Sequence, residues 1–470
     1  EPPPPLVPRV VPVTLPSDDV PIASLVVTES PYNAKQDGSV DATTPFQQAI
    51  DNAASRGGGV VFIPAGKYRF DGSLTLKEKV TLRGDWQSPH DGGTGKGTIL
   101  EIYGGRGSET GTPFLTMHRG TGVKNLTIWY PAQTISVVPY PWTIFCLPSF
   151  SSGGSDNTSV INVTLVNPYQ AIKIGPASNE LHYIRTVYGT PLKTGIWLSQ
   201  TTDIGRIINV HFDPKYWSGS TLSNSPSEAS IKAWTQANGE GIAMGRSDWE
   251  YMYDISLIGY KTGVRIFRYD PSGPAANGVI YGLRTEEGEV GIKFEMGNPY
   301  GFAITNSTIN ASAGSAPVCV LATNTFSTVA QFNTCSFGGS PKTAILFEDN
   351  STARMTFQNC TFADWGYQGG DAAVKLQNGS VAILGSEFKK DKPHVYLGTG
   401  VPNAQILDNK VPVKLNISDL SAGEVAISQE PLGMPKLNAP SHQFAAERKP
   451  ATNALFVVST YGAVGDKSTD

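Results

Sequence analysis

The sequence has little charge and little cysteine for its length. Asp, Glu, Lys and Arg make up only 16% of its 470 residues, and 36 basic against 40 acidic residues leave a formal net charge of −4. Weak, balanced charge excludes a chain kept unfolded by self-repulsion and argues against a nucleic-acid binder, which carries a basic stripe. Four cysteines exclude a small disulfide scaffold. No apolar run approaches the roughly 18 residues of a membrane span, so we do not expect a membrane as a partner. The balanced charge likewise leads us to expect no nucleic acid as a partner.

The residues that are plentiful favour a secreted protein. Glycine is abundant, with 50 residues, whereas methionine is scarce, with six. Asn-x-Ser/Thr triplets occur nine times, either as glycosylation sites or as a by-product of turns rich in Asn and Thr. We therefore expect an extracellular location.

The first 80 residues divide into a lead, a helix and short strands. Residues 1–30 are rich in proline, which predicts an extended segment without its own core. Phe46, Ile50 and Ala53 then recur at helical spacing and predict a short amphipathic helix. A triple glycine ends it, and the apolar run 60–63 predicts a buried strand.

A four-residue unit with apolar or small second and fourth positions recurs along the rest of the chain. Eight of the ten steps between successive units fall between 22 and 28 residues. The units are 125–128, 162–165, 184–187, 209–212, 254–257, 280–283, 306–309, 334–337, 359–362, 385–388 and 408–411. This period, with about three short strands in each, predicts a solenoid of parallel strands in which each coil buries one slice of core. A β-sandwich is the alternative, but its strands turn back without a fixed coil period.

Alternation along each strand assigns the second and fourth positions to the interior. Phe337, Phe362 and Phe388 then form one column. Cys335 and Cys360 become inward neighbours, either as a disulfide or, as we favour, as two buried thiols.

One long step between units, 45 residues, contains an insertion over residues 213–238. Its second half predicts a helix with Ser225 as N-cap, Pro226 as first residue and Glu228 closing a capping box. Insertions on solenoids often border the binding face.

The last ten residues repeat an early motif. Tyr, Ala, Asp and Asp occur at the same spacing in residues 32–41 and again in residues 461–470. We therefore divide the chain into a lead (1–30), a solenoid (31–425), and a linker with the start of a second module (426–470). That second module is an expected partner.

The motif at 32–41, the helix near 46–54 and the run Gly57-Gly-Gly-Val-Val-Phe-Ile-Pro-Ala-Gly-Lys-Tyr resemble the opening of the pectate-lyase-3-like superfamily. They are similar to proteins related to glycoside hydrolase families 28 and 55. The resemblance implies an all-β, right-handed parallel β-helix with a short N-terminal capping helix, and a carbohydrate-active protein. The tandem start looks most like family 55, exo-acting β-1,3-glucanases with two β-helices. Their principal acid lies in the second helix, so the resemblance assigns no catalytic position here.

Glycoside cleavage needs two carboxyl groups, about 5–5.5 Å apart for retention and about 6.5–9.5 Å for inversion. Rungs of a β-helix lie about 4.8 Å apart, so carboxylates on nearby rungs meet these distances. His211 and Asp213 share one outward face, and Trp217 follows as a sugar platform. A surface histidine beside a turn-forming Asp-Pro is the alternative interpretation.

A second candidate cluster combines two segments one coil apart. Its catalytic candidates are Asp248, Glu286 and Glu287, and its substrate-binding candidates are Trp249, Tyr251 and Arg284. Crowded acids can raise one carboxyl pKa, as an acid catalyst requires. A coil step of 26 places Tyr260 and Lys261 beneath Glu286 and Glu287. A solvated acidic turn, with aromatics covering a coil joint, is the alternative.

We favour a secreted glycoside hydrolase acting on a polysaccharide such as a β-1,3-glucan, without metal or cofactor. His/Cys spacing typical of zinc sites is absent. The alternatives are a pectate-type polysaccharide lyase and a non-catalytic solenoid for glycan binding or attachment.

Overall fold

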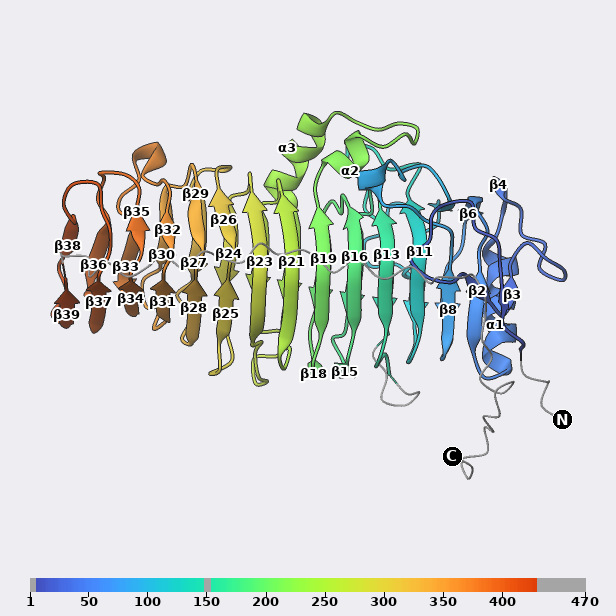
Figure 1. Cartoon of the computed structure of the whole chain (residues 1–470), viewed down its shortest axis with the longest axis horizontal. Helices are drawn as coiled ribbons and strands as arrows, with labels where there is room; N and C mark the ends of the chain where they lie inside the picture. Colours follow the sequence, from blue (N-terminus) through green and yellow to red (C-terminus); the bar gives the residue numbers. More distant parts are fainter. Residues whose placement is uncertain (1–5, 148–153, 429–470) are drawn as a thin grey trace, which may run out of the picture.

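The computed structural model describes residues 6–147 and 154–428, and in them the chain winds into a parallel β-helix (Figure 1). The coils follow one another along a single long axis, from the first coils beside α1 (Thr43–Ser55) to the last beside β39 (Glu424–Ile427). The predicted fold class is therefore confirmed. Within these described ranges, no helix is long and apolar enough to cross a membrane.

One face of the solenoid is a sheet of 13 parallel strands, one from each coil. In spatial order it contains β7 (Leu74–Leu76), β10 (Leu115–Met117), β12 (Trp142–Cys146), β14 (Gln170–Ile174), β17 (Thr194–Leu198), β20 (Glu240–Met244), β22 (Thr262–Ile266), β24 (Val290–Phe294), β27 (Val318–Ala322), β30 (Thr343–Phe347), β33 (Val374–Asn378), β36 (Val395–Gly400) and β38 (Ile417–Asp419).

The opposite face is a bent parallel surface, whose strands run through the bend in the central coils and stop at it in later ones. In the first coils the strands before the bend are β3 (Leu25–Val26), β5 (Gly59–Phe62) and β8 (Val80–Arg83), and those after it are β4 (Asp37–Asp41), β6 (Gly66–Phe70) and β9 (Thr98–Ile102). The strands that run through the bend are β11 (Gly122–Trp129), β13 (Ser159–Leu165), β16 (Tyr183–Gly189), β19 (Arg206–Phe212), β21 (Glu250–Ile258) and β23 (Gly278–Glu286). Later coils contribute β25 (Phe302–Thr305), β26 (Thr308–Ala311), β28 (Val329–Asn333), β29 (Ser336–Gly339), β31 (Arg354–Gln358), β32 (Thr361–Phe362), β34 (Ser380–Leu384), β35 (Glu387–Phe388), β37 (Asn403–Leu407) and β39.

A single left-handed residue makes the bend in each coil from β11 onward. These residues have φ between +51° and +71° and are Asn125, Asn162, Thr186, Asn209, Asp254, Gly282, Asn306, Thr334, Asn359, Gly385 and Asp408. Asn, Asp and Gly dominate because they tolerate this conformation best. The side-chain amide of Asn162 donates to the side-chain oxygen of Asn125 at 2.9 Å, so these neighbouring bends are also bonded to each other.

The bend corrects two of the predicted units. Val187 pairs with Val163, and Leu283 pairs with Ile255, so these residues occupy the second position of their units and not the fourth. The units at 184–187 and 280–283 therefore begin two residues too early. In both units an inward apolar residue stands two positions before the bend, Ile184 or Ile280, and the sequence pattern does not distinguish it from the inward residue after the bend.

The predicted phenylalanine column is confirmed. The rings of Phe337 and Phe362 stack with centroids 5.3 Å apart, and those of Phe362 and Phe388 with centroids 4.5 Å apart. All three side chains are buried. Cys335 and Cys360 are buried free thiols, as favoured.

The N-terminal end is covered by α1 and by the lead. Phe46, Ile50 and Ala53 of α1 are fully buried, as the helical spacing predicts. The sequence predicts that the lead is an extended segment without its own core. In the structure it forms an antiparallel pair, β1 (Arg9–Val10) with β2 (Ile22–Ala23), and packs on the solenoid.

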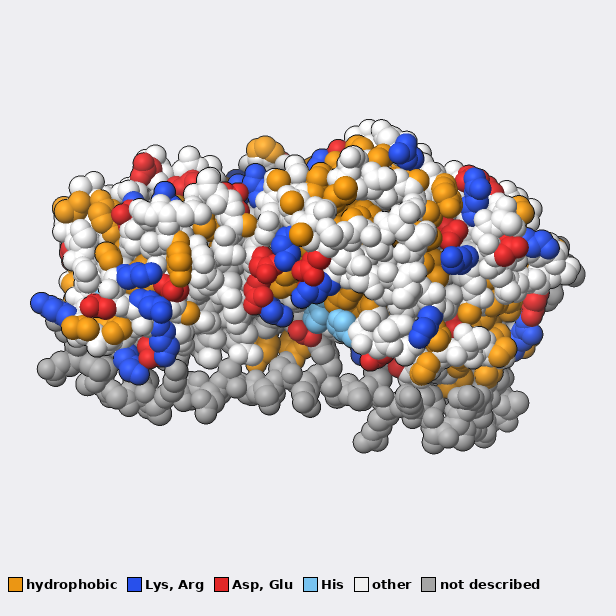
Figure 2. Space-filling view, turned by 90° about the horizontal axis from the view of Figure 1, so that it is seen from above, with side chains coloured by type: hydrophobic (Ala, Val, Ile, Leu, Met, Phe, Trp, Pro, Cys, Tyr) orange, Lys and Arg blue, Asp and Glu red, His pale blue; other side chains and the backbone are white. Residues whose placement is uncertain are grey.

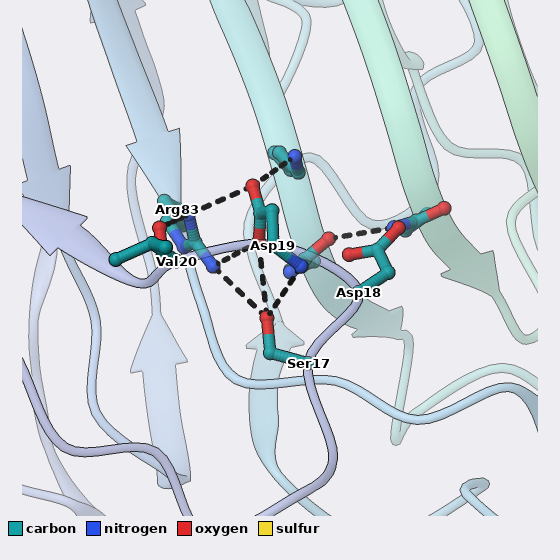
Figure 3. Close-up of polar contacts among 8 residues, drawn as sticks. Ser17, Asp18, Asp19, Val20 and Arg83 are labelled. Carbon is teal, nitrogen blue, oxygen red and sulfur yellow. Dashed lines mark hydrogen bonds and ion pairs between the residues drawn. The ribbon is translucent and has the colours of Figure 1, made fainter. Parts of the chain in front are cut away.

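Polar contacts hold the lead across the outer surface of the first coils (Figure 3). The carboxylate of Asp19 pairs with Arg83 and Lys124, each at 2.6 Å, and Ser17 bonds to both Asp19 and Arg83.

The insertion forms two helices, α2 (Lys215–Ser218) and α3 (Glu228–Asn238), at the carboxyl ends of the central strands (Figure 1). The helix α3 begins later than predicted: Ser227 is its N-cap, accepting from the Ser230 amide, and Ser225 instead bonds within the preceding loop. Two 3-10 turns, η1 (Pro89–Asp91) and η2 (Tyr367–Gly369), and a small pair, β15 (Asn179–Glu180) with β18 (Thr201–Asp203), complete the fold. The repeated motif at 461–470 lies outside the described residues.

Candidate active site

Polar and aromatic side chains gather where the insertion helices meet the outward face of the central coils. We call this set the central cluster: His90, Tyr188, His211, Asp213, Tyr216, Asp254, Arg284 and Glu286. The bent strands β16, β19, β21 and β23 supply six of these residues or end at them, η1 supplies His90, and α2 supplies Tyr216. In Figure 2, pale blue histidine atoms lie against a patch of mixed red and blue charge on this face.

Histidine and tyrosine rings form one side of the central cluster. Nε2 of His90 lies 2.6 Å from the Tyr216 hydroxyl. The Tyr188 and Tyr216 rings stack with centroids 5.8 Å apart, and His211 lies 5.3 Å from Tyr188. Burial, and then the nearby His211, lower the pKa of His90, so its imidazole stays neutral at pH 7.

His211 occupies the outward position between Tyr188 and Ser256 on the neighbouring strands. Its Nε2 lies 3.4 Å from Oδ1 of Asp254, the bend residue of β21. That nitrogen is buried and makes no hydrogen bond with good geometry. The pair is therefore a loose electrostatic contact.

Asp213 follows β19 directly and lies two residues before α2 begins. Its Oδ1 accepts the backbone N–H of Lys215 at 2.8 Å. Burial raises the pKa of Asp213, and the hydrogen bond and the charge of Lys215 only partly oppose it. A carboxyl group with a raised pKa suits a proton donor.

Glu286 ends β23 in the same outward column as Asp213. Phe212 pairs with Leu257 and Ile258 pairs with Glu286, so Ile258 lies between the two acids. The predicted placement of Tyr260 beneath Glu286 is therefore wrong, because this coil step is 28 residues.

Arg284 and Glu286 form a bidentate ion pair, with Nη2–Oε2 at 2.8 Å and Nε–Oε1 at 3.0 Å. Glu287 turns instead toward α3, where its carboxylate lies 2.7 Å from Lys232. Of the two predicted neighbours, Glu286 therefore belongs to the central cluster and Glu287 braces the insertion helix.

The charge around the central cluster is negative on balance. Six acids (Asp91, Asp213, Glu228, Asp254, Glu286 and Glu287) stand against three bases (Lys215, Lys232 and Arg284) among the charges that act on this face, which leaves a balance of −3. Such a surface disfavours an acidic polymer.

The structure separates the remaining predicted site residues from this cluster. Asp248, Trp249 and Tyr251 lie at the opposite, amino-terminal end of β21, where Asp248 pairs with Arg246 at 2.7 Å. Trp217 is only 1% exposed and packs in a satellite core with Ile231, so its ring is not available as a platform.

Sequence reasoning missed His90 and Tyr188, whereas Tyr216 and Asp254 lie within the two stretches it singled out, although neither was given a role. The step of 23 residues from Tyr188 to His211 matches one coil, so the repeat contained a signal for Tyr188. His90 offered none, because it comes from a loop 121 residues before His211.

Within residues 6–147 and 154–428, no three His, Cys, Asp or Glu side chains come together as a set that would hold a metal ion.

Comparisons with known proteins show which family the chain matches. The profile of the family described as rhamnogalacturonase A/epimerase, pectate lyase-like, matches residues 28–265. Mannuronan C5-epimerase AlgE3 of Azotobacter vinelandii is 36% identical over 100 residues, 18% of this chain but only 5% of the epimerase. The chain thus spans a small part of that relative.

Two solved structures share the fold. The A-module of Azotobacter vinelandii mannuronan C-5 epimerase AlgE6 aligns with a TM-score of 0.54 and 15% identity, covering 86% of this chain and 96% of the module. The pre-mature gene product 12 of bacteriophage phi29 aligns with a TM-score of 0.56 and 13% identity, covering 86% of this chain and 57% of that protein. The family profile covers more than half of the 470 residues, so the chain belongs to the rhamnogalacturonase A/epimerase, pectate lyase-like family.

Proposed function

We propose that this protein is a carbohydrate-active enzyme that hydrolyses a neutral polysaccharide at the central cluster. Asp213 is the general acid and Glu286 is the general base. The proposal includes an extracellular location, where such polymers occur. The observation that carries it is the shared outward column of Asp213 and Glu286, two coils apart.

The spacing of that column selects a stereochemical course. Two rungs of about 4.8 Å separate the backbones of the acids by roughly 9.6 Å, and side chains that lean together bring their carboxyl groups closer. Inverting glycosidases hold their two carboxyls about 6.5–9.5 Å apart, which leaves room for the attacking water. We therefore propose inversion.

The environments of the two acids suit different roles. Burial raises the pKa of Asp213 and favours its protonated form, which donates a proton to the leaving oxygen. Arg284 forms a bidentate pair with Glu286 and holds that carboxylate in place, where it accepts a proton from water. The stacked rings of Tyr188 and Tyr216 offer a flat apolar surface for the C–H face of a sugar beside these groups.

The experiment is a product assay with the full chain on laminarin, xylan and polygalacturonate. We expect reducing ends from a neutral polymer, and their loss in Asp213→Asn and Glu286→Gln. Asp349→Asn is the matched control, because Asp349 is an exposed turn residue far along the chain. Full activity in both site variants contradicts the proposal, and binding of a polymer without release of ends supports a non-catalytic solenoid.

A proton-transfer reaction on a uronate sugar is the second candidate. The contact of His90 with Tyr216 at 2.6 Å favours it, because a neutral imidazole can take a proton and a phenol can supply one. The similarity to a mannuronan C5-epimerase over 100 residues also supports it. Removal of the C5 proton followed by loss of the C4 oxygen yields an unsaturated sugar, whereas return of a proton to the other face yields an epimer. Ultraviolet absorption or altered NMR signals from polygalacturonate or alginate would identify this reaction.

A further inference from the structure

A second exposed aromatic surface lies at the amino-terminal ends of β21, β23 and β25. Trp249 and Tyr300 stand there with ring centroids 6.0 Å apart and planes 28° apart. Their side chains are unusually open for large aromatics, with Trp249 45% and Tyr300 76% exposed. Scattered apolar residues on a surface are ordinary, but two rings in contact beside a hollow indicate a binding site.

The hollow beside them measures about 110 Å³ and has an apolar floor. Tyr251, Val279, Ala303 and Gln331 follow one another in register on β21, β23, β25 and β28, and all of them face outward. The small side chains of Val279 and Ala303 form the floor between the larger Tyr251 and Gln331. We call Trp249, Val279, Tyr300, Ala303 and Gln331 the edge site.

The backbone holds Trp249 in a costly conformation. Its φ is +65°, which is unfavourable for a bulky side chain and is typically maintained where function requires it. Its N–H donates to the side-chain oxygen of Asn277 at 2.9 Å, and Asn277 is buried. The next residue, Glu250, is also buried and bonds to His182 and Ser247. These contacts hold the backbone that presents the Trp249 ring at the surface.

The chemistry of the edge site selects a neutral ligand. None of the described residues that line the hollow is charged. In sequence Trp249 lies between two acids that already have partners: Asp248 pairs with Arg246, and Glu250 is buried against His182 and Ser247. Aromatic faces and an apolar floor suit the C–H face of a sugar ring, and the Gln331 amide can both donate to and accept from sugar hydroxyls. We propose that the edge site binds an uncharged pyranose ring of a glycan chain.

The edge site is distinct from the central cluster. Ser256, which pairs with His211, lies seven residues after Trp249, about 23 Å along the strand at about 3.3 Å per residue, and the bend at Asp254 comes between them. Binding at the edge site therefore does not depend on hydrolysis at the central cluster.

Affinity gel electrophoresis of the full chain tests this proposal, with soluble laminarin and xylan as neutral probes and polygalacturonate as the charged one. We expect retardation by at least one neutral polymer, and quenching of tryptophan fluorescence on binding. Trp249→Ala should weaken that binding at least about tenfold, as expected for loss of an aromatic anchor. Ala303→Trp should do the same by filling the floor while leaving Trp249 in place, and it decides the question if Trp249→Ala misfolds.

Tyr269→Ala is the matched control. Tyr269 is 48% exposed and packs edge-on against Trp197, a residue of the 13-stranded sheet, so its loss should leave binding unchanged. The proposal is overturned if neither neutral polymer is bound, if Ala303→Trp binds like the wild type, or if only polygalacturonate is bound.

Discussion

Asp213 and Glu286 face outward in one column of the β-helix, with Ile258 between them. The two acids do not contact each other. Asp213 accepts from the backbone N–H of Lys215, and Glu286 pairs with Arg284. Two carboxyl groups in one column but in different environments are the arrangement from which acid and base roles arise.

Replacing Asp213 with Asn should reduce the rate of reducing-end release about 10²–10⁴-fold, the contribution of a general acid. The amide keeps the bond to the Lys215 backbone but has no proton of suitable acidity to donate. Initial rates on the polymer that the wild type cleaves give the measurement. Asp349→Asn should match the wild type, and equal rates in all three proteins would remove Asp213 from the mechanism.

The products should first appear with inverted anomeric configuration. A water held between Glu286 and the sugar attacks from the face opposite the leaving group, and the two-coil separation leaves room for it. Proton NMR of the reaction in its first minutes distinguishes the anomers before they equilibrate. Retention would require a nearer nucleophile, and Asp254 would then be the residue to test.

Asp213 should also make stability depend on pH. Burial raises its pKa in the folded state, so its contribution to stability is present below the ordinary aspartate pKa of about 3.9 and is lost as pH rises through the raised value. Asp213→Asn carries no charge at any pH. We expect its melting temperature to exceed that of the wild type at pH 7 and to match it below about pH 4. A difference that does not change with pH would show that the carboxyl keeps an ordinary pKa.

The coil architecture was predictable because strand alternation and the repeat act on many residues at once. The column of Phe337, Phe362 and Phe388 needed only the step length and the alternation of faces. The phase of a single unit is weaker information. Thr186 and Gly282 make the bends of the two misplaced units, and each bend has an apolar residue two positions before it, Ile184 and Ile280, so both units were placed two residues early.

The candidate site was predictable only where it follows the repeat. His211, Asp213 and Glu286 lie on the coils and were found. His90 reaches the same place from a loop, and its position depends on tertiary packing that no local pattern encodes. Trp249 and Arg284 were placed together because their segments belong to successive coils, although the two residues lie at opposite ends of neighbouring strands.

The four cysteines should react with a thiol reagent only after unfolding. All four are free and buried, and burial raises the pKa of Cys146 to about 11 and that of Cys319 to about 12. The native protein should therefore release almost no colour with Ellman's reagent at pH 8, and the protein in guanidinium should show four thiols. Two thiols in denaturant without reductant would indicate a bond between Cys335 and Cys360.

Truncating the middle of the aromatic column should destabilise the solenoid strongly. Phe362 is fully buried, stacks on both Phe337 and Phe388 and also contacts Phe357, so Phe362→Ala opens a cavity and removes three ring contacts. Such changes typically cost about 3–5 kcal/mol. Each coil depends on its neighbours, so we expect the coils around β32 to unfold before the central coils do. Hydrogen exchange measured by mass spectrometry would show faster exchange in residues 329–407 and little change in residues 159–258.

The control is Tyr300→Ala, whose exposed ring should change stability by no more than about 0.5 kcal/mol. Uniformly faster exchange along the whole chain would mean that the solenoid unfolds as one cooperative unit, and that adjacent coils are coupled more tightly than a stack of nearest neighbours.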